Sequence, residues 1–373
     1  MSDYESAVVR FGPDFSLKDC SEVESECCIR FGDSEAGAPI LTIGIPVYNG
    51  YLSINRTLNS VYSGLQMLAV VDKVEIVICD NASTDQTGLA IQDFFSGKHV
   101  RGGYFRHRAN IGFDMNLDSI VKCGTGRYVW FLGCGDEIKE DAISRLVGKL
   151  EHINVSNILL DFDRFSEADA TLIQKREYPN NIDLIVKGRD DFSHQRYAPA
   201  LSANVVKREE WLACLKNKFV TSGWGHVERI LRIISLKEQS ETAILATPFF
   251  TLFVDKKGWW TKADGYKLHL EHIKVIMSMK AMGFNAAAVN DRLHELNGVV
   301  LIRSVIGAKK YGYDFSESDL NEIRGCSRFG IFPLIRLGLH MPLRLASFIF
   351  SESKRKAIRL GTRKLYKRII GGR

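Results

Sequence analysis

Two acidic segments each follow an apolar run, at positions where a strand is expected to end. Asp80 comes directly after residues 75–79, while Asp136 and Glu137 come after residues 128–132 and a short glycine-rich turn. A carboxylate at a strand end can accept hydrogen bonds from a base or ribose, or bind a hard cation that neutralises a diphosphate. The chemistry that these types and positions favour is the binding of a phosphorylated nucleotide.

Two further segments admit a structural interpretation beside the functional one. Residues 45–49 end an apolar run at Pro46 and continue with Tyr48 and Asn49, which is either a nucleotide-binding strand end or an ordinary turn signal. In residues 80–85, Ser83 or Asp85 could instead cap a helix that begins near Gln86. Capping explains Ser83 and Asp85 and leaves Asp80 unexplained.

The elements that position these residues alternate regularly. We expect strands at residues 41–47, 74–79, 103–105 and 128–132, and helices at residues 52–65, 87–95, 113–121 and 141–150. Such alternation predicts an α/β fold with a mainly parallel twisted sheet flanked by helices and joined by right-handed crossovers. Sheets of this kind bind ligands beyond the carboxyl ends of their strands.

At these motifs the chain resembles the inverting family-2 glycosyltransferases, which have the GT-A fold. The resemblance rests on Pro46-x-Tyr48-Asn49, on Asp80-x-x-Ser83-x-Asp85, on Asn110-Ile111-Gly112 with Asn116, and on the strand at residues 128–132, and it covers about residues 40–150. It implies a nucleoside-diphosphate sugar as donor. The donor-binding residues that we predict are Pro46, Tyr48, Asn49, Asp80, Asn81, Ser83, Asn110, Gly112, Asn116, Gly135 and Trp259.

Residues 133–137 stand where this family has an Asp-x-Asp motif that binds a divalent cation. Cys134 replaces the first carboxylate and Asp136 matches the last, so we expect Mg²⁺ or Mn²⁺ to depend on Asp136 with help from Glu137. A glycine-rich turn with solvated acids is one alternative. The same Leu-Gly-Cys-Gly sequence also resembles the cofactor loop of S-adenosylmethionine methyltransferases, although that loop normally follows the first strand.

The general base is expected in residues 221–228, which resemble the abequosyltransferase-like branch that serves bacterial O-antigen assembly. His226 is the first choice because an imidazole titrates near neutral pH, and Glu228 is the second. Alternatively, His226 caps a helix and Glu228 pairs with Arg229 or Arg232 on a solvated face. Residues 255–260, which include Trp259, suit either a loop that closes over the diphosphate or simple packing of tryptophans. His269 and His272 are expected to be solvated.

Composition and charge distribution add four expectations. The 373 residues carry a formal charge of +6, with an acidic start and a basic end. The eight cysteines include no CxxC pair, and this usage is typical of thiols that stay reduced in a cytosol. Neither a secretory signal nor an apolar run of ~18 residues is visible. We expect an acidic extension (1–38), a donor-binding half (39–155), an acceptor-binding half (156–310) and a basic amphipathic tail (311–373).

The tail mixes apolar clusters with a dense run of Lys and Arg over residues 354–368, as interfacial helices do. We expect it to bind the anionic inner face of the cell membrane rather than nucleic acid, since no stacking platform lies among its cations. The whole pattern predicts a cytoplasmic, peripherally bound glycosyltransferase acting on a lipid-linked or oligosaccharide acceptor. An inactive relative that only binds carbohydrate is the remaining alternative.

Overall fold

The computed structural model describes most of the chain, in two compact units. The described residues are 25–31, 37–67, 71–96, 98, 100–175, 178, 182–195, 199–217, 223–254, 265–296, 301–327 and 332–340. Unit 1 comprises Met1–Lys187, Arg196–Lys218 and Gln239–Phe253, and unit 2 comprises Gly188–Gln195, Phe219–Glu238 and Val254–Arg373. Each unit is considered separately below.

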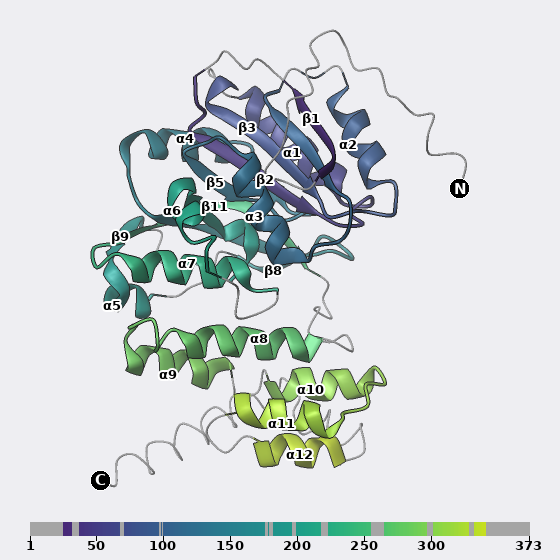
Figure 1. The fold of residues 1–373 in the computed structure, drawn as a ribbon, viewed down its shortest axis with the longest axis vertical. Helices are drawn as coiled ribbons and strands as arrows, with labels where there is room; N and C mark the ends of the chain where they lie inside the picture. Colours follow the sequence, from purple (N-terminus) through teal and green to yellow (C-terminus); the bar gives the residue numbers. More distant parts are fainter. Residues whose placement is uncertain are drawn as a thin grey trace. The chain divides into compact units, whose positions relative to one another are not determined.

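Four parallel strands form the centre of unit 1 (Figure 1). They are β2 (Leu41–Val47), β3 (Val74–Asp80), β4 (Gly102–His107) and β5 (Tyr128–Phe131), and they lie in the order β4-β3-β2-β5. The chain steps outward from β2 to β4 and then returns to the other side of β2 for β5. The strand order therefore reverses between β2 and β5, which is where sheets of this class bind ligands.

The reversal also decides which helices cover which face. With right-handed crossovers, α1 (Ile54–Gln66) and α2 (Thr87–Phe95) lie on one face of the sheet, and α3 (Phe113–Cys123) lies on the other. Accordingly, α1 contacts α2 and α4 (Ala142–His152), whereas α3 contacts α6 (Arg208–Ala213).

Strand β2 is buried on both faces. Leu41, Ile43 and Ile45 belong to the core cluster that includes side chains of α1 and α4. On the opposite face, a Cβ atom on Gly44 would stand 2.3 Å from Ile120 Cγ2 of α3, so this close approach requires glycine. The continuous apolar character of β2 follows from this double burial.

Antiparallel strands extend the sheet on both sides. Beyond β5 come β10 (Asn204–Lys207), β7 (Asn157–Ser166), β11 (Glu241–Val254) and β6 (Glu137–Ile138), while β8 (Leu172–Gln174) pairs with β7 and β9 (Leu184–Lys187) pairs with β11. These pairings confirm the predicted α/β class with a mixed, mainly parallel centre. β11 was not among the predicted strands.

Residues 1–38 show neither helical nor strand periodicity in the sequence, yet their described part contains a strand. Ser25–Phe31 forms β1, which pairs antiparallel with β4 at the edge of the sheet. An edge strand needs a partner's backbone groups and not an alternating sequence, so side-chain periodicity did not reveal it. Residues 1–24 lie outside the described part.

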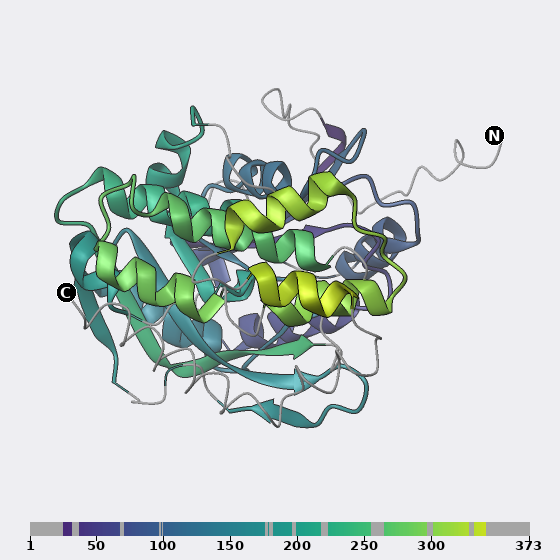
Figure 2. The same ribbon diagram turned by 90° about the horizontal axis from the view of Figure 1, so that it is seen from below.

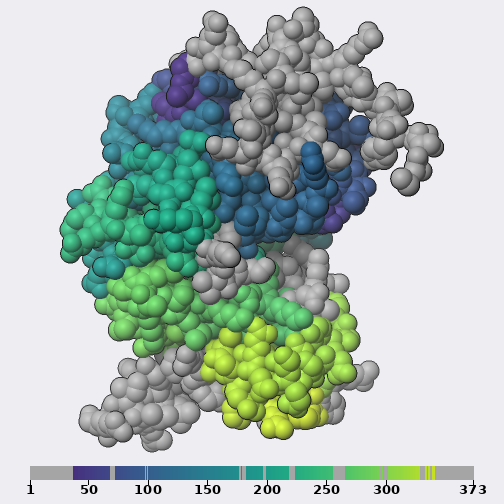
Figure 3. Space-filling model, viewed as in Figure 1, coloured from purple at the N-terminus to yellow at the C-terminus, as the bar shows by residue number. Residues whose placement is uncertain are grey.

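Unit 2 is built from helices in its described residues. They are α5 (Gly188–Ser193), α7 (Gly225–Leu236), α8 (Gly265–Ser278), α9 (Ala286–Glu295), α10 (Leu301–Lys310), α11 (Glu317–Cys326) and α12 (Phe332–His340). α8 contacts α9, α10 and α11, and α10 contacts α12, so helices α8 to α12 form one connected group (Figures 2 and 3).

The sequence pattern also favours a helix from Asn285 to about Val305. The described residues of this stretch form α9 and α10, and residues 297–300 between them lie outside the described part. Among the described helices, none combines the length and the apolarity that crossing a bilayer requires.

Candidate donor-binding site

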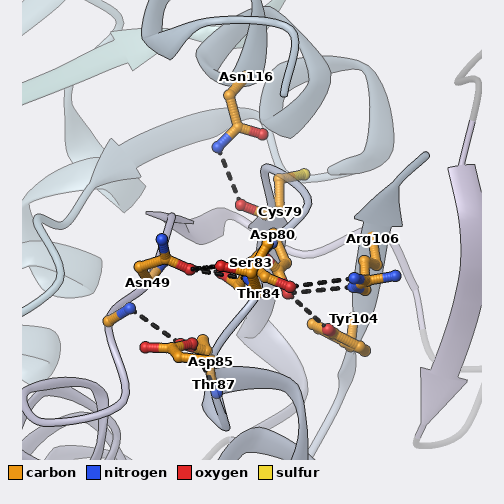
Figure 4. Close-up of polar contacts among 11 residues, drawn as sticks. Asn49, Cys79, Asp80, Ser83, Thr84, Asp85, Thr87, Tyr104, Arg106 and Asn116 are labelled. Atoms are coloured by element: carbon orange, nitrogen blue, oxygen red, sulfur yellow. Dashed lines mark hydrogen bonds and ion pairs between the residues drawn. The ribbon is translucent and has the colours of Figure 1, made fainter. Parts of the chain in front are cut away.

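Hydrogen bonds join the loop after β2 to the loop after β3 (Figure 4). The Asn49 N–H donates to Ser83 Oγ at 2.8 Å, and Asn49 Oδ1 accepts from the Thr84 N–H at 2.8 Å. The Gly50 N–H donates to Thr87 Oγ1 at 2.9 Å. These bonds leave the Tyr48 and Asn49 side chains exposed at the carboxyl ends of the strands.

Pro46 marks the point where β2 and β5 separate. The paired register of the two strands ends at Gly44 and Phe131, so Pro46 lies just beyond it and its missing N–H is not needed for that pairing. On its other side, β2 continues in register with β3 to Val47 and Asp80. The pairing between β2 and β5 therefore ends just before Pro46.

Asp80 is fully buried and shapes the β3 loop. Its Oδ1 accepts from the Ser83 N–H at 2.8 Å, its Oδ2 accepts from the Tyr104 hydroxyl at 2.8 Å, and Arg106 Nε lies 3.7 Å from Oδ2 (Figure 4). Both carboxylate oxygens thus have protein partners. This arrangement holds the loop in one conformation.

The capping interpretation of this segment is confirmed for Asp85 and wrong for Ser83. Asp85 Oδ1 accepts from the Thr87 N–H at 3.0 Å, at the start of α2. Ser83 Oγ accepts from Asn49 instead and so joins two loops.

Three asparagines continue this set of hydrogen bonds toward α3. Asn81 Nδ2 donates to Asn110 Oδ1 at 3.0 Å, and Asn81 Oδ1 accepts from the Ile111 N–H at 2.8 Å. Asn116 Nδ2 donates to the Cys79 carbonyl at 2.9 Å, which ties α3 to the end of β3. Gly112, which precedes α3, has a φ of 86°, a conformation that favours glycine.

Helix α1 holds the loop after β5, residues 133–137. The Gly135 N–H donates to Thr57 Oγ1 at 2.8 Å, and that hydroxyl donates to the Asp136 carbonyl at 2.8 Å. Ser53 Oγ lies 3.4 Å from Cys134 Sγ. Since residues 49–53 contact both neighbouring loops, the loops after β3, β2 and β5 form one connected polar surface.

Asp136 is buried under this surface and Glu137 is exposed. Burial raises the pKa of Asp136 to about 7, and hydrogen bonds from Ser202 and the backbone of Phe253 oppose that rise. Within the described residues no three His, Cys, Asp or Glu side chains are grouped to hold a metal. One or two carboxylates suffice for Mg²⁺ when substrate phosphates and waters complete its shell, so Asp136 and Glu137 fit that kind of site.

Two residues at this loop were missed by the sequence analysis. Arg56 donates to Glu167 at 2.9 and 2.7 Å and to the Gly135 carbonyl at 3.0 Å. Ser202 donates to Asp136 Oδ2 at 2.5 Å. Neither belongs to a recognisable motif, and both reach the loop from distant parts of the sequence, so no local signal marked them.

His226 and Glu228 lie at the start of α7 in unit 2, and both are buried. The pairing of Glu228 with Arg232 is confirmed, at 2.7 Å, but the expected solvated face is wrong because Glu228 is only 1% exposed. Trp259 and residues 255–260 lie outside the described residues. A catalytic role for His226 or Glu228 stays a prediction.

The expectation that His269 and His272 are solvated was wrong. Both are buried, and the His272 ring stacks on Trp224 with centroids 4.2 Å apart. His269 Nε2 lies 3.1 Å from the Leu296 carbonyl oxygen. Both histidines lie on helix α8, but their side chains pack against protein and not against water.

Comparisons with known proteins agree with this geometry. Residues 42–203 match the model of glycosyl transferase family 2. Over 203 residues, or 50% of the chain, the sequence is 27% identical to the abequosyltransferase RfbV of Salmonella typhimurium and spans 59% of the length of that relative.

Solved structures share the fold at low sequence identity. S. aureus TarS 1–349 in complex with UDP-GlcNAc has a TM-score of 0.54 at 13% identity, covering 86% of this chain and 92% of TarS 1–349. The mannosyltransferase PcManGT of Pyrobaculum calidifontis, in complex with GDP-Man and Mn²⁺, has a TM-score of 0.50 at 16% identity, covering 92% of this chain and 90% of the other. The methyltransferase alternative is thereby set aside: residues 42–203 match family 2 glycosyl transferases, and the chain has the GT-A fold.

Proposed function

We propose that this protein is a glycosyltransferase that moves a hexose or deoxyhexose from a nucleoside-diphosphate sugar to a hydroxyl group with inversion. The observation that carries the proposal is the connected polar surface over β3, β2 and β5, at the point where strand order reverses. The nucleoside would lie along Tyr48, Asn49 and Asn81, and the diphosphate would reach Gly135 and Asp136.

Asp136, with Glu137, would hold Mg²⁺ or Mn²⁺ on the donor diphosphate. When bound, the cation would supply positive charge that stabilises the departing diphosphate. The chain's own part is to present one buried carboxylate in a fixed orientation, since Cys134 stands where the related motif has its other acid. Burial of Asp80 suits an indirect role, in which its carboxylate fixes the loop that contacts the nucleoside.

For the acceptor side we propose His226 as the general base, with Glu228 as the second choice. The ion pair with Arg232 already engages Glu228 Oε1, which favours His226. The acceptor would be a lipid-linked or oligosaccharide glycan of the bacterial surface, in the same broad class of pathway as the abequosyltransferase relative. The basic amphipathic tail, residues 311–373, would hold the enzyme on the inner face of the cell membrane, with its densest run of Lys and Arg after residue 340.

A donor screen tests the proposal directly. UDP-, GDP-, CDP- and dTDP-sugars are tested for thermal stabilisation with and without Mn²⁺, followed by hydrolysis or transfer assays with the sugar that stabilises most. We expect one nucleotide class to stabilise the protein and Mn²⁺ to strengthen the effect. Asp136→Asn should remove the Mn²⁺ dependence, while Asp163→Asn, on the nearby β7, should retain it.

Stabilisation by none of the four classes would contradict the donor assignment. Binding without hydrolysis or transfer would favour a carbohydrate-binding protein that has lost catalysis.

A further inference from the structure

Ser202 is the feature of unit 1 that the proposed function has not used. It belongs to a short 3-10 turn, η2 (Leu201–Ala203), immediately before β10, and it is fully buried. Its hydroxyl accepts from the Gly133 N–H at 2.8 Å and donates to Asp136 Oδ2 at 2.5 Å. One side chain from a distant segment thus bridges the two ends of the residue 133–136 turn.

The serine is itself held in place from two directions. The Trp130 indole N–H, on β5, donates to the Ser202 carbonyl at 2.8 Å. Asn204 Nδ2 donates to the carbonyls of Ala200 and Leu201 at 2.6 and 3.2 Å, which fixes the turn around Ser202. The hydroxyl therefore occupies a defined position relative to β5.

Gly133 lies close to both the Asp136 carboxylate and the Ser202 hydroxyl. A Cβ atom at this position would lie 2.9 Å from Asp136 Oδ2 and 3.3 Å from Ser202 Oγ. The absence of a side chain lets the carboxylate and the hydroxyl meet. Gly133 and Ser202 together define where Oδ2 can lie.

We propose that Ser202 is a positioning residue that fixes the Asp136 carboxylate for cation binding, compensating for the absence of a second motif carboxylate at Cys134. The inference rests on the proposed function. In a site that offers few protein ligands, the orientation of the principal one determines affinity. Hydrogen-bond partners of metal-binding carboxylates commonly change metal affinity by about 10–100-fold when they are removed.

The experiment uses the full chain and Mn²⁺ as probe. Mn²⁺ binding is measured by electron paramagnetic resonance in the presence of UDP, GDP, CDP or dTDP, whichever stabilises the wild type most. Ser202→Ala should weaken Mn²⁺ binding about 10-fold or more. Affinity for the same nucleotide without metal should not change, and kcat/KM should recover partly at high Mn²⁺.

Three further variants separate positioning from folding. Ser202→Thr keeps the hydroxyl and should retain most of the Mn²⁺ affinity, whereas Gly133→Ala should lower it by pushing Oδ2 away. Ser240→Ala removes a buried hydroxyl that bonds Ser156, near the opposite end of β10, and should leave Mn²⁺ affinity unchanged. If Ser202→Ala fails to fold, Gly133→Ala and Ser202→Thr carry the test.

The possible failures are distinguishable. If the wild type binds Mn²⁺ with none of the four nucleotides, the proposed metal-assisted function is wrong. If the wild type binds Mn²⁺ and either Ser202→Ala or a folded Gly133→Ala binds it equally well, the positioning role of Ser202 is overturned.

Discussion

Asp80, at the end of β3, and Asp136, in the loop after β5, are both buried carboxylates, but their surroundings differ. Asp80 has a protein donor at each oxygen, so it stabilises the conformation of its loop. Asp136 accepts hydrogen bonds from the Ser202 hydroxyl and from the backbone of Phe253, and burial raises its pKa to about 7. A carboxyl group that is costly to ionise in isolation gains most from a bound cation.

The role of His226 can be tested at the level of one side chain. His226→Ala should lower sugar transfer by roughly 10²–10⁴-fold, because the acceptor hydroxyl would lose its base, while donor-induced thermal stabilisation persists. His272→Gln is the matched control, since it changes another buried histidine beside Trp224 and should keep most of the turnover per folded molecule. Transfer at the wild-type rate in His226→Ala would discard the assignment.

At the scale of elements, a buried carboxylate joins the amino ends of the central strands. Glu75 on β3 accepts from the Thr42 hydroxyl of β2 at 2.6 Å, from the Gly126 N–H at 3.0 Å, and from both the N–H and the hydroxyl of Thr125. It thereby links β2, β3 and the turn before β5, and so helps set the register on which the site at the opposite ends depends.

Glu75→Gln should therefore destabilise unit 1. The change removes charge-assisted hydrogen bonds in a buried place, and we expect a loss of about 1–3 kcal/mol in the free energy of unfolding. Denaturant titration followed by circular dichroism measures it. Glu151→Gln, which breaks an exposed pair with Lys73, is the control and should have little effect; equal losses in the two variants would contradict the structural role of Glu75.

Burial of His272 of α8 against Trp224 should make the stability of unit 2 sensitive to acid. Burial, and then the positive charges of His269, His226 and Arg292, lower the pKa of His272 to about 3. Burial also lowers the pKa of His269, although its hydrogen bond to the Leu296 carbonyl opposes this.

The folded state thus favours neutral His272, whereas the unfolded chain takes up a proton near the ordinary value of about 6.5. Its contribution to stability is complete above about pH 6.5 and declines as the pH falls toward 3, by at most ~1.4 kcal/mol per pH unit. Denaturant midpoints measured between about pH 7 and pH 5 should fall, and His272→Gln should flatten that slope. An unchanged slope in the variant would assign the acid sensitivity to other groups.

At the scale of the whole molecule, membrane binding by the basic end of the chain can be tested with lipid vesicles. Deleting residues 341–373 removes the densest run of Lys and Arg and leaves every described helix, since α12 ends at His340. The full chain should co-sediment with anionic phosphatidylglycerol vesicles and lose binding as salt rises, while the truncated chain should stay in solution.

Neutral phosphatidylcholine vesicles serve as the control for that experiment. Equal partition of the two chains into anionic vesicles would defeat the proposal. Tighter binding to duplex DNA at the same salt would favour the nucleic-acid alternative.

The sequence alone determined the parallel centre of the fold. Its apolar runs are separated by amphipathic stretches at helical spacing, and both signals are local, so strands β2 to β5 and helices α1 to α4 could be placed in advance. The same local chemistry marked Asp80, which directly follows a buried run, and Asp136, which follows one after a short glycine-rich turn. Backbone pairing carried no such signal, which is why β1 and β11 were missed.

Only the tertiary structure decided which side chains meet. Ser202 stands 66 positions from Asp136, and Arg56 stands 111 positions from Glu167. Their contacts depend on β10 lying beside β5 and on α1 packing over the loop, which no periodicity expresses. Burial of His226, Glu228 and His272 was likewise decided by packing, since helical spacing shows that residues share a face but not what covers that face.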